Sequence, residues 1–222
     1  MSFHGNPMRW LSSLFPQTLI ELHTPYNRNI KVIKNHNNIS LQVNGVEQSG
    51  VYVNTLFRRA FERLAVSSPK PVRRILVMGV GGGMALRQLR AIFPQAHITG
   101  VDIDPVIIAV AKEYFGLDYL GNSSFIVSDA RKYAEKRLAR RNLFDLVIVD
   151  IFIGNDVPEF VTEKRFLQSV NNLLRPGGQL MMNYFRYSKQ PEKTKIHTRT
   201  LSKIFQSVES ENILRNTVFY CS

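Results

Sequence analysis

The sequence predicts an α/β fold with a doubly wound, mostly parallel sheet of seven strands, preceded by a small N-terminal antiparallel β-hairpin or sheet. Three observations predict it. From residue 72 onward, continuous apolar segments alternate with amphipathic helical segments, which is typical of parallel strands buried on both faces. Before residue 68, apolar residues alternate around Asn44-Gly45, the strongest short signal of a β-hairpin. The chain of 222 residues, 44% of them hydrophobic, is long enough to bury a core without disulfides.

The N-terminal region, residues 1–68, is expected to begin with strands over 18–53. Asn and Gly tolerate the positive φ angles of a type I′ turn, so Asn44-Gly45 joins two antiparallel strands, and Val51 and Val53 continue the extended pattern. A helix capped by Asn54 or Thr55 follows. Its apolar face comprises Leu56, Phe57, Ala60, Phe61 and Leu64. The segment 67–71, rich in Ser and Pro, separates this region from a second domain, residues 72–222.

The second domain is predicted as alternating strands and helices. Strands are expected at 75–78, 97–101, 124–127, 144–149, 179–184 and 217–221. Helices are expected at 84–92, 105–114, 131–140, 163–174 and 196–206. Asp104 precedes Pro105 and is expected to cap the second of these helices.

The net charge of +12 lies in the flanks: +7 within 1–74, +1 within 75–185 and +4 within 186–222. A solvated basic surface explains this. The alternative is a site for RNA, DNA or another acidic partner, for which the sequence offers no motif. That alternative would place basic side chains along the mouth of the site: Arg58, Arg59, Arg63, Arg73, Arg74, Arg186 and Lys189.

Several classes of protein are not supported. The single cysteine, Cys221, forms no internal disulfide and is expected to be a small core residue. The five histidines lack ligand spacing, so no metal site is predicted. No apolar run reaches the roughly 18 residues of a membrane span, and the chain is expected to be soluble and cytoplasmic.

The segment from Gly79 to Gly83 (GVGGG) stands at a strand-to-helix turn. Glycines let a backbone take positive φ angles and approach a ligand closely, and the helix N-terminus behind them attracts anionic or polar groups. Asp102 ends the second strand, where a carboxylate can accept both hydroxyls of a ribose. Asp129 and Asp150 end the third and fourth strands. Because ligands bind at the carboxyl ends of open α/β sheets, these acids predict one nucleoside site.

The sequence argues against ATP or GTP hydrolysis, because the loop lacks the Lys-Ser/Thr pair of a phosphate-binding P-loop. NAD remains an alternative, although the chain offers no obvious second catalytic domain.

Several segments resemble a known family, the class I S-adenosylmethionine-dependent methyltransferase fold, which is Rossmann-like. They are 75–83 (ILVMGVGGG), 101–104 (VDID), 128–130 (SDA), 144–150 (FDLVIVD) and 174–178 (LRPGG). Within that fold they are most similar to the spermidine synthases and other polyamine aminopropyltransferases. Residues 41–48 (LQVNGVEQ) resemble that family's Leu-x-Leu-Asp-Gly-x-x-Gln hairpin.

The resemblance implies a cofactor, S-adenosylmethionine or its decarboxylated form, and assigns residues to it. The cofactor-binding residues are Gly79, Gly81, Gly83, Asp102, Ile103, Asp129 and Ala130. Among them, Asp102 holds the ribose and Asp129 accepts from the adenine amino group. Asp150 is implied as the catalytic carboxylate that orients an amine and takes its proton. Candidate residues on the acceptor side are Gln48, Phe152, Asp156 and Tyr184. The family also suggests a homodimer through the N-terminal region.

The sequence departs from the aminopropyltransferases at three places. Gly82 stands where that family has an aspartate that helps to hold the cationic donor chain. Residues 49–61 contain no acid, and an apolar segment, 151–153, follows Asp150. A polyamine needs several carboxylates to offset its lost hydration.

Three hypotheses follow from these departures. Methyl transfer to an unidentified acceptor is favoured; true aminopropyl transfer, with Asp156 recruited to the amine, is the alternative. A non-catalytic nucleoside-binding or scaffold protein is the alternative from another class.

Overall fold

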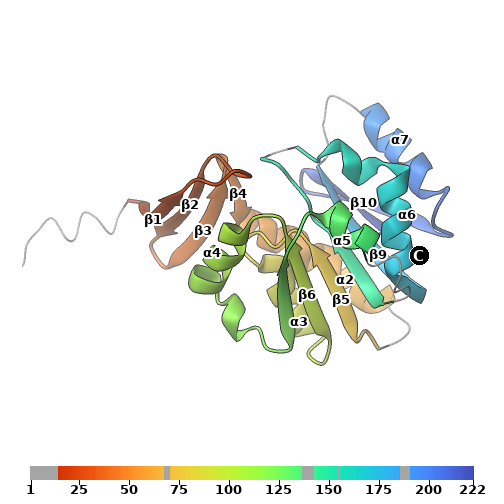
Figure 1. Ribbon diagram of the computed structural model, residues 1–222, viewed down its shortest axis with the longest axis horizontal. Helices are drawn as coiled ribbons and strands as arrows, with labels where there is room; N and C mark the ends of the chain where they lie inside the picture. Colours follow the sequence, from red (N-terminus) through yellow and green to blue (C-terminus); the bar gives the residue numbers. More distant parts are fainter. Residues whose placement is uncertain (1–14, 68–70, 137–142, 155, 186–190) are drawn as a thin grey trace, which may run out of the picture.

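The structure is a computed structural model of the 222-residue chain, and it describes residues 15–67, 71–136, 143–154, 156–185 and 191–222. Within these ranges the chain forms two β-sheets, with helices around the larger one (Figure 1).

The smaller sheet is antiparallel and comes from the N-terminal region. Its strands, in spatial order, are β1 (Gln17–Leu22), β2 (Ile30–Asn35), β3 (Asn38–Val43) and β4 (Val46–Ser49). Asn44 and Gly45 join β3 to β4 with φ angles of 52° and 79°. Both positive angles suit the predicted type I′ turn, which is confirmed.

The larger sheet has the order β10-β11-β9-β8-β5-β6-β7. Its strands are β5 (Arg74–Met78), β6 (His97–Asp102), β7 (Ser123–Val127), β8 (Phe144–Val149), β9 (Leu174–Phe185), β10 (Val208–Ile213) and β11 (Asn216–Cys221). The five strands from β5 to β9 run parallel, while β11 and β10 pair antiparallel at one side. The predicted fold class, a mostly parallel seven-stranded sheet with a small antiparallel sheet before it, is confirmed.

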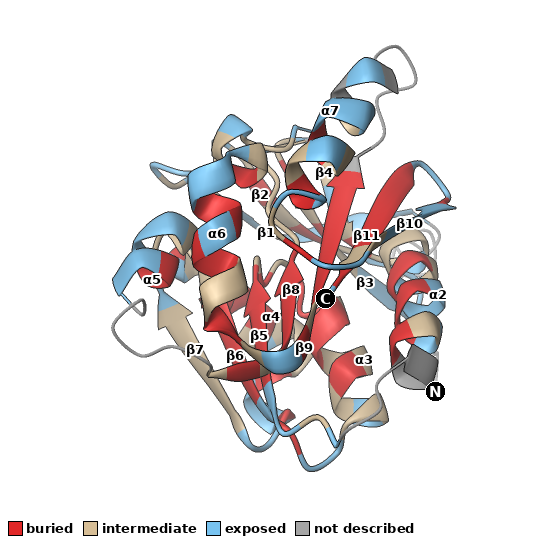
Figure 2. Ribbon diagram, turned by 90° about the vertical axis from the view of Figure 1, so that its right-hand side faces the viewer, coloured by how far each residue is buried: buried red, intermediate tan, exposed pale blue. Residues whose placement is uncertain are grey.

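Helices cover both faces of this sheet. They are α2 (Val51–Ser67), α3 (Met84–Ile92), α4 (Pro105–Phe115), α5 (Ala130–Lys136), α6 (Lys164–Leu173) and α7 (Pro191–Leu201), with 3₁₀ turns η1 (Leu117–Tyr119) and η2 (Glu159–Thr162). Ile75 and Val77 of β5 face a core formed with α2, α3 and α4. Leu76 and Met78 face the opposite core, formed with α5, α6 and α7. The central strands, such as β5 and β8, are therefore buried on both faces and mostly red in Figure 2.

A third apolar cluster joins the small sheet to the large domain. Ile30, Val32, Leu41 and Val43 on one face of the small sheet pack against α4, where Ile107 and Val110 are buried. This packing holds the N-terminal sheet beside the carboxyl ends of the parallel strands, where the predicted site lies.

Two boundaries differ from the expectation. Val51 and Val53 belong to α2 and not to a strand, because Val53 packs into the core shared by α2 and α3. The last helix spans 191–201 and not 196–206. Ile204 and Phe205, whose apolar spacing suggested a longer helix, pack on the core from the turn that follows it.

Some expectations are incomplete or fall outside the described residues. Strand β10 was not predicted, since its sequence VESENI is polar and largely exposed at the sheet edge. The expected helix at 131–140 is described as far as Lys136, and the remainder lies outside the described residues. The boundary near residue 68 lies there too, and the division into domains 1–68 and 72–222 stays a prediction. None of the helices within the described ranges has the length and apolar character to span a membrane.

Candidate functional site

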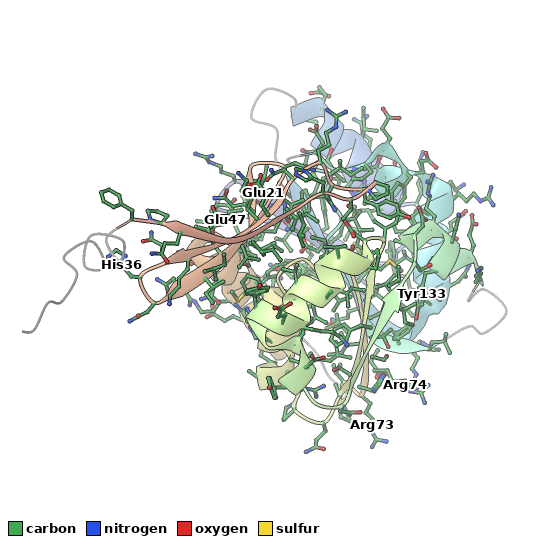
Figure 3. All side chains as sticks on the ribbon, turned by 60° about the vertical axis from the view of Figure 1, so that its left-hand side comes forward. Glu21, His36, Glu47, Arg73, Arg74 and Tyr133 are labelled. Carbon is green, nitrogen blue, oxygen red and sulfur yellow. The ribbon has the colours of Figure 1, made fainter. Side chains whose placement is uncertain are left out.

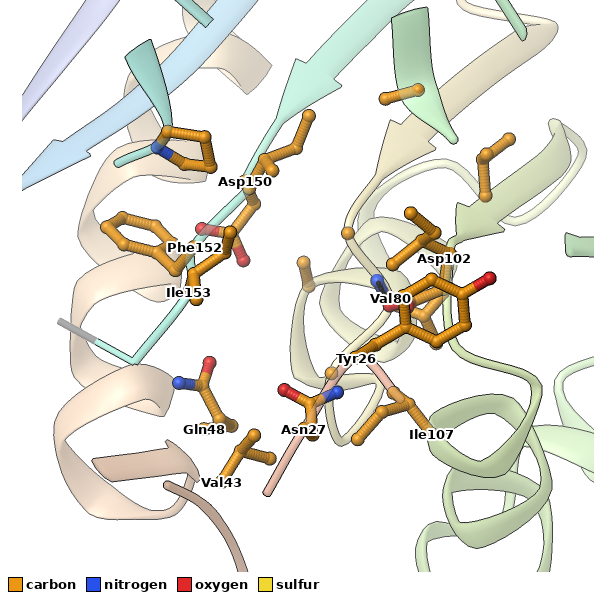
Figure 4. A pocket seen from close by; sticks show the side chains of 18 of the residues that line it. Tyr26, Asn27, Val43, Gln48, Val80, Asp102, Ile107, Asp150, Phe152 and Ile153 are labelled. Atoms are coloured by element: carbon orange, nitrogen blue, oxygen red, sulfur yellow. Dashed lines mark hydrogen bonds between the residues drawn. The ribbon is translucent and has the colours of Figure 1, made fainter. Parts of the chain in front are cut away.

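A cavity of about 340 Å³ opens at the carboxyl ends of β5, β6, β7 and β8 (Figure 4). The loop after β5, Asp102, Asp129 and Asp150 line it together. The predicted convergence of three aspartates and a glycine loop at one edge of the sheet is therefore found in the structure. The N-terminal region closes the opposite side with Tyr26, Asn27, Val43 and Gln48, so both sheets contribute to the cavity.

The glycine loop needs a glycine most strictly at Gly79. Its φ angle is 96°, and a Cβ there would lie 2.0 Å from the backbone oxygen of Asp150. Gly79 thereby lets the loop touch the end of β8, and Gly81 lines the cavity beside it. Gly83 does not line the cavity: it precedes α3 with φ 72° and packs on Leu117. The predicted contact of Gly83 with the nucleoside site is therefore not found in this structure, where Gly83 packs against Leu117 instead.

Asp102 is held by backbone N–H groups. Oδ2 accepts from the Val80 N–H at 2.9 Å, and Oδ1 accepts from the Asp104 N–H at 3.0 Å. Burial raises the pKa of Asp102 above its usual value, and these donors partly offset the increase. The Gly81 N–H also interacts with this carboxylate, and the oxygen lone pairs that these donors leave free can accept hydroxyl groups.

Asp129 directly precedes α5 and binds its first turn. Its Oδ1 accepts from the N–H groups of Arg131 and Lys132 at 2.8 and 3.1 Å, which caps the helix. Oδ2 lies 3.6 Å from the Arg131 guanidinium, which also stacks over Phe160. Asp129 and Ala130 both line the cavity, and so does Ile103, which is partly exposed. Apart from Gly83, the residues expected to contact the adenosine therefore line this cavity, with Arg131 as an unpredicted addition.

Asp150 stands between two cavities. Its Oδ1 accepts a hydrogen bond from Asn183 Nδ2 at 2.8 Å. The pKa of Asp150 is raised to about 6: burial raises it most, the hydrogen bond from Asn183 lowers it, and the nearby charge of Asp102 raises it. A carboxylate with a pKa near neutrality is suited to exchange a proton with an amine.

The second cavity, of about 260 Å³, lies on the other side of Asp150 and shares Gln48, Phe57 and Phe152 with the first. One side of it is apolar. The polar residues that line it are Glu47, Gln48, Tyr52, Asp150, Asn183, Arg215 and Asn216. A group bound in this cavity would meet Asp150 from the side opposite the glycine loop.

The predicted acceptor residues divide into two pairs. Gln48 and Phe152 line both cavities, as Figure 4 illustrates for the first. Tyr184 lines neither: it is 5% exposed and stacks on His197 in the core between β9 and α7. Asp156 also lines neither; its backbone pairs with Ile153, which does line the first cavity. The expectation that Asp156 and Tyr184 lie at the acceptor is therefore wrong in this structure.

The basic residues do not gather at the mouth. Arg73 and Arg74 lie at the start of β5, at the end of the sheet opposite the cavity (Figure 3), where their N–H groups bind Asp145. Arg63 pairs with Glu209, and Arg58 with Glu62. Arg186 and Lys189 lie outside the described residues. Among described residues, Arg131 and Arg215 are the basic side chains that line the two cavities.

Two other expectations concern cysteine and metals. Cys221 is 3% exposed within the core, as predicted. In the part of the chain that the structure describes, no three His, Cys, Asp or Glu side chains gather as a metal site would require.

The sequence interpretation missed several lining residues. Tyr26 and Asn27 lie on the β1–β2 loop, whose approach to β6 no local pattern indicates. Asn183 did carry a signal, since it interrupts the apolar part of β9, whereas Asn216 stands at the start of β11. A buried amide within an apolar strand requires hydrogen-bond partners and therefore marks a polar site.

The lining fits an adenosyl group. The backbone at Gly79 leaves no room for a side chain, so this wall of the cavity is flat. Asp102 can accept the two hydroxyls of a ribose, and Asp129 lies at the end of the adjacent strand. Apolar surface from Ile103, Ile107 and Phe160 suits the faces of a base.

The family model described as "Methyltransferase domain" matches residues 70–218. A polyamine aminopropyltransferase of Vibrio vulnificus is 34% identical over 122 residues, which are 55% of this chain and 40% of that protein. An "eEF1A lysine and N-terminal methyltransferase homolog" of Drosophila melanogaster is 29% identical over 157 residues, 67% of this chain and 23% of that protein. The crystal structure of a spermidine synthase from Thermotoga maritima superposes with a TM-score of 0.78 at 14% identity, covering 93% of this chain and 72% of that one. The chain thus spans less than half the length of these two curated relatives.

Proposed function

The chain belongs to the methyltransferase-domain family, and from that premise we propose that it transfers a methyl group from S-adenosylmethionine to an amine. The first cavity binds the adenosyl donor, with Asp102 at the ribose, Asp129 and Ala130 at the adenine, and the glycine loop beneath the sulfonium. The second cavity admits the acceptor, and Asp150 stands between the two.

The observation that carries the choice of methyl transfer is the contact between Gly82 and Ser49. A Cβ at position 82 would lie 2.5 Å from the Cβ of Ser49 and 2.8 Å from its Oγ. Ser49 is fully buried, and its Oγ accepts the Leu41 N–H at 2.9 Å, so it does not readily move aside. The aspartate that holds the donor chain in the aminopropyltransferases therefore has no room here. Without it, a donor that carries the carboxylate of methionine is favoured, because its ammonium is then balanced internally.

The bound sulfonium supplies an electrophilic methyl group and a neutral thioether as leaving group. Asp150 acts on the acceptor: its free oxygen accepts a hydrogen bond from the amine and directs the nitrogen lone pair toward the donor. As the N–C bond forms and the C–S bond breaks, the nitrogen becomes cationic and releases one proton, which Asp150 takes. Phe152 and Phe57 line both cavities and exclude water from the space between donor and acceptor.

Aminopropyl transfer is the second candidate, and two observations favour it. The Vibrio vulnificus relative is named a polyamine aminopropyltransferase, and Gln48, which matches the hairpin glutamine of that family, lines both cavities. The Drosophila melanogaster relative is named for lysine and N-terminal methylation. For methyl transfer by this chain, we therefore propose an amine of a protein as the acceptor. A homodimer through the N-terminal sheet stays a prediction in either case.

Calorimetric titration with S-adenosylmethionine, S-adenosylhomocysteine and decarboxylated S-adenosylmethionine tests the proposal. We expect the first two to bind more tightly than the decarboxylated form. Tight binding of the decarboxylated form alone would establish the aminopropyl donor instead. Binding of none of the three would contradict both transferase functions, and binding without methyl transfer to any peptide or polyamine would favour the non-catalytic alternative.

A further inference from the structure

Asp150 is the last member of a chain of hydrogen bonds that joins three elements. Tyr52 at the start of α2 donates its hydroxyl to Asn216 Oδ1 at 2.6 Å. Asn216 Nδ2 on β11 donates to Asn183 Oδ1 on β9 at 2.8 Å, and Asn183 Nδ2 donates to Asp150 Oδ1 at 2.8 Å. Asn183 and Asn216, on the antiparallel neighbours β9 and β11, thus connect the carboxylate to a phenol of α2.

The direction of this chain is determined at its far end. The backbone N–H of Arg215 donates to the Tyr52 hydroxyl oxygen at 3.1 Å. The hydroxyl directs its own proton to Asn216 Oδ1, and this bond favours the amide orientation with oxygen facing Tyr52. Asn216 then presents its NH₂ group to Asn183, and Asn183 presents its own to Asp150. Reversing either amide would place two acceptors against each other.

The two asparagines at the centre of this hydrogen-bond chain are buried, whereas Tyr52 and Asp150 at its ends are partly exposed. Asn183 and Asn216 are each 4% exposed, so each needs its partners. Tyr52, Asn216, Asn183 and Asp150 together form a continuous polar wall of the second cavity. Among the described residues, Asp150 Oδ2 has no hydrogen-bond donor, which leaves it available to a molecule in the cavity.

We propose that Tyr52, Asn216 and Asn183 are positioning residues that tie Asp150 Oδ1 and leave Oδ2 for the acceptor amine. The part of this proposal that concerns the amine rests on the proposed function, and the part that concerns the carboxylate does not. Tyr52 acts through the two amides and touches neither the donor cavity nor the reacting atoms.

The expected consequence is a change in the protonation of Asp150. Loss of the Tyr52 hydroxyl frees the Asn216 amide, and a reversed Asn183 would present its oxygen to Asp150. That arrangement favours the protonated acid, which donates to it. The other charged or titratable groups that line the two cavities are Asp102, Asp129, Arg131, Glu47, Arg215 and Tyr26. None of these is altered by Tyr52→Phe.

A ¹³C NMR titration of the aspartate carboxyl signals tests the proposal on the free protein, with Asp150→Asn to assign the signal. The midpoint for Asp150 should move upward in Tyr52→Phe by at least ~0.5 pH unit, and further in Asn183→Ala, which removes the donor itself. Tyr119→Phe is the matched control, because that phenol is 92% exposed. It should titrate as the wild type does.

An unchanged midpoint in Tyr52→Phe would overturn the proposal. If Tyr52→Phe does not fold, Asn216→Ala provides the same comparison, since it interrupts the chain one step later. The titration uses neither donor nor acceptor, so failure of the proposed function leaves its outcome intact. Conversely, normal binding of S-adenosylhomocysteine with an unshifted midpoint would contradict the positioning role alone.

Discussion

Thr24 of the β1–β2 loop donates its hydroxyl to the Asp104 carboxylate at 2.6 Å, across 80 positions of sequence. The same oxygen of Asp104 accepts from Asn27 Nδ2 at 2.8 Å, and the other oxygen caps α4 through the Val106 N–H at 2.9 Å. Asp104 is fully buried. One carboxylate therefore caps a helix of the large domain and also fastens the loop that carries the cavity residues Tyr26 and Asn27.

Asp104→Ala should lower the free energy of unfolding by about 2–4 kcal/mol, because it removes a cap and leaves buried donors without acceptors. Thr24→Val, which removes one donor to Asp104 and the acceptor of the Tyr26 and Asn27 N–H groups, should cost less, about 1–2 kcal/mol, because it leaves the cap of α4 in place. Chemical denaturation of both variants measures the difference. Equal losses would show that Asp104 acts only through Thr24.

Asp102→Ala should weaken the binding of S-adenosylhomocysteine by about 100-fold or more, because two hydroxyls lose a charged acceptor. Asp118→Asn is the control, since Asp118 is an exposed aspartate paired with Lys112. Calorimetry gives both affinities. Binding that survives Asp102→Ala would refute the assignment of this residue to the ribose.

Gly82→Ala should destabilise the protein by about 1–3 kcal/mol through the clash with Ser49. The backbone at Gly82 lies outside the left-handed region, so the contact alone causes the loss. In a Ser49→Gly background the added methyl group gains room, and the same substitution should cost about 1 kcal/mol less. A double-mutant cycle by denaturation measures this coupling. Additive losses would mean that Ser49 does not exclude a side chain at position 82.

Asp150→Asn should stabilise the fold at neutral pH. The pKa of Asp150 is about 6 in the folded protein, against 3.8 for an unperturbed aspartate. Its contribution to stability is therefore full below pH 3.8 and is lost as the pH rises through 6. Asparagine avoids this loss and still accepts from Asn183, so the gain should reach about 1–3 kcal/mol at pH 7 and vanish near pH 4. Unfolding curves at several pH values test this. A gain that does not depend on pH would contradict the raised pKa.

His197 should make the folded protein less stable in acid, which is the opposite of the pH dependence expected from Asp150. It is 2% exposed, and burial lowers its pKa to about 4 from 6.5. Stability contributed by the neutral ring is present above pH 6.5 and is lost as the pH falls through 4. His197→Phe, which can still stack between Tyr184 and Phe219, should remove this acid-induced loss. Thermal unfolding between pH 4 and 7 compares the variants. An unchanged acid slope would show that the pKa of His197 is the same in the folded and the unfolded protein.

In the wild-type protein the two groups change the free energy of unfolding in opposite directions. As the pH rises from 4 to 6, the contribution of Asp150 falls while that of His197 rises. We therefore expect the two groups to cancel in part, and each to become visible when the other is replaced.

Much of the site was predictable because its signals are local. The Asn44-Gly45 turn, the cap at Asp104 and the glycine at Gly79 each follow from the backbone angles that particular residues allow. The positions of Asp102 and Asp150 follow from strand periodicity, since residues that end neighbouring parallel strands meet at one edge.

The wrong or missing predictions share a physical cause. Tyr184 ends an apolar strand and was expected at the acceptor, but the direction of its side chain depends on the packing of α7, more than ten residues later. Strand β10 forms by pairing with β11, which needs no apolar pattern of its own at a sheet edge. Asp156 was placed by its distance from Asp150 along the chain, whereas the turn that it forms with Ile153 decides its position.

The sequence alone thus determined the order of strands and helices, the glycine turn and the edge at which three acids gather, because periodicity and backbone preference act over a few residues. Only the tertiary structure decided that Ser49 fills the space above Gly82 and that Tyr52 reaches Asp150 through two asparagines. These contacts join residues more than 30 positions apart. They depend on how whole elements pack, which the pattern of any one segment does not specify.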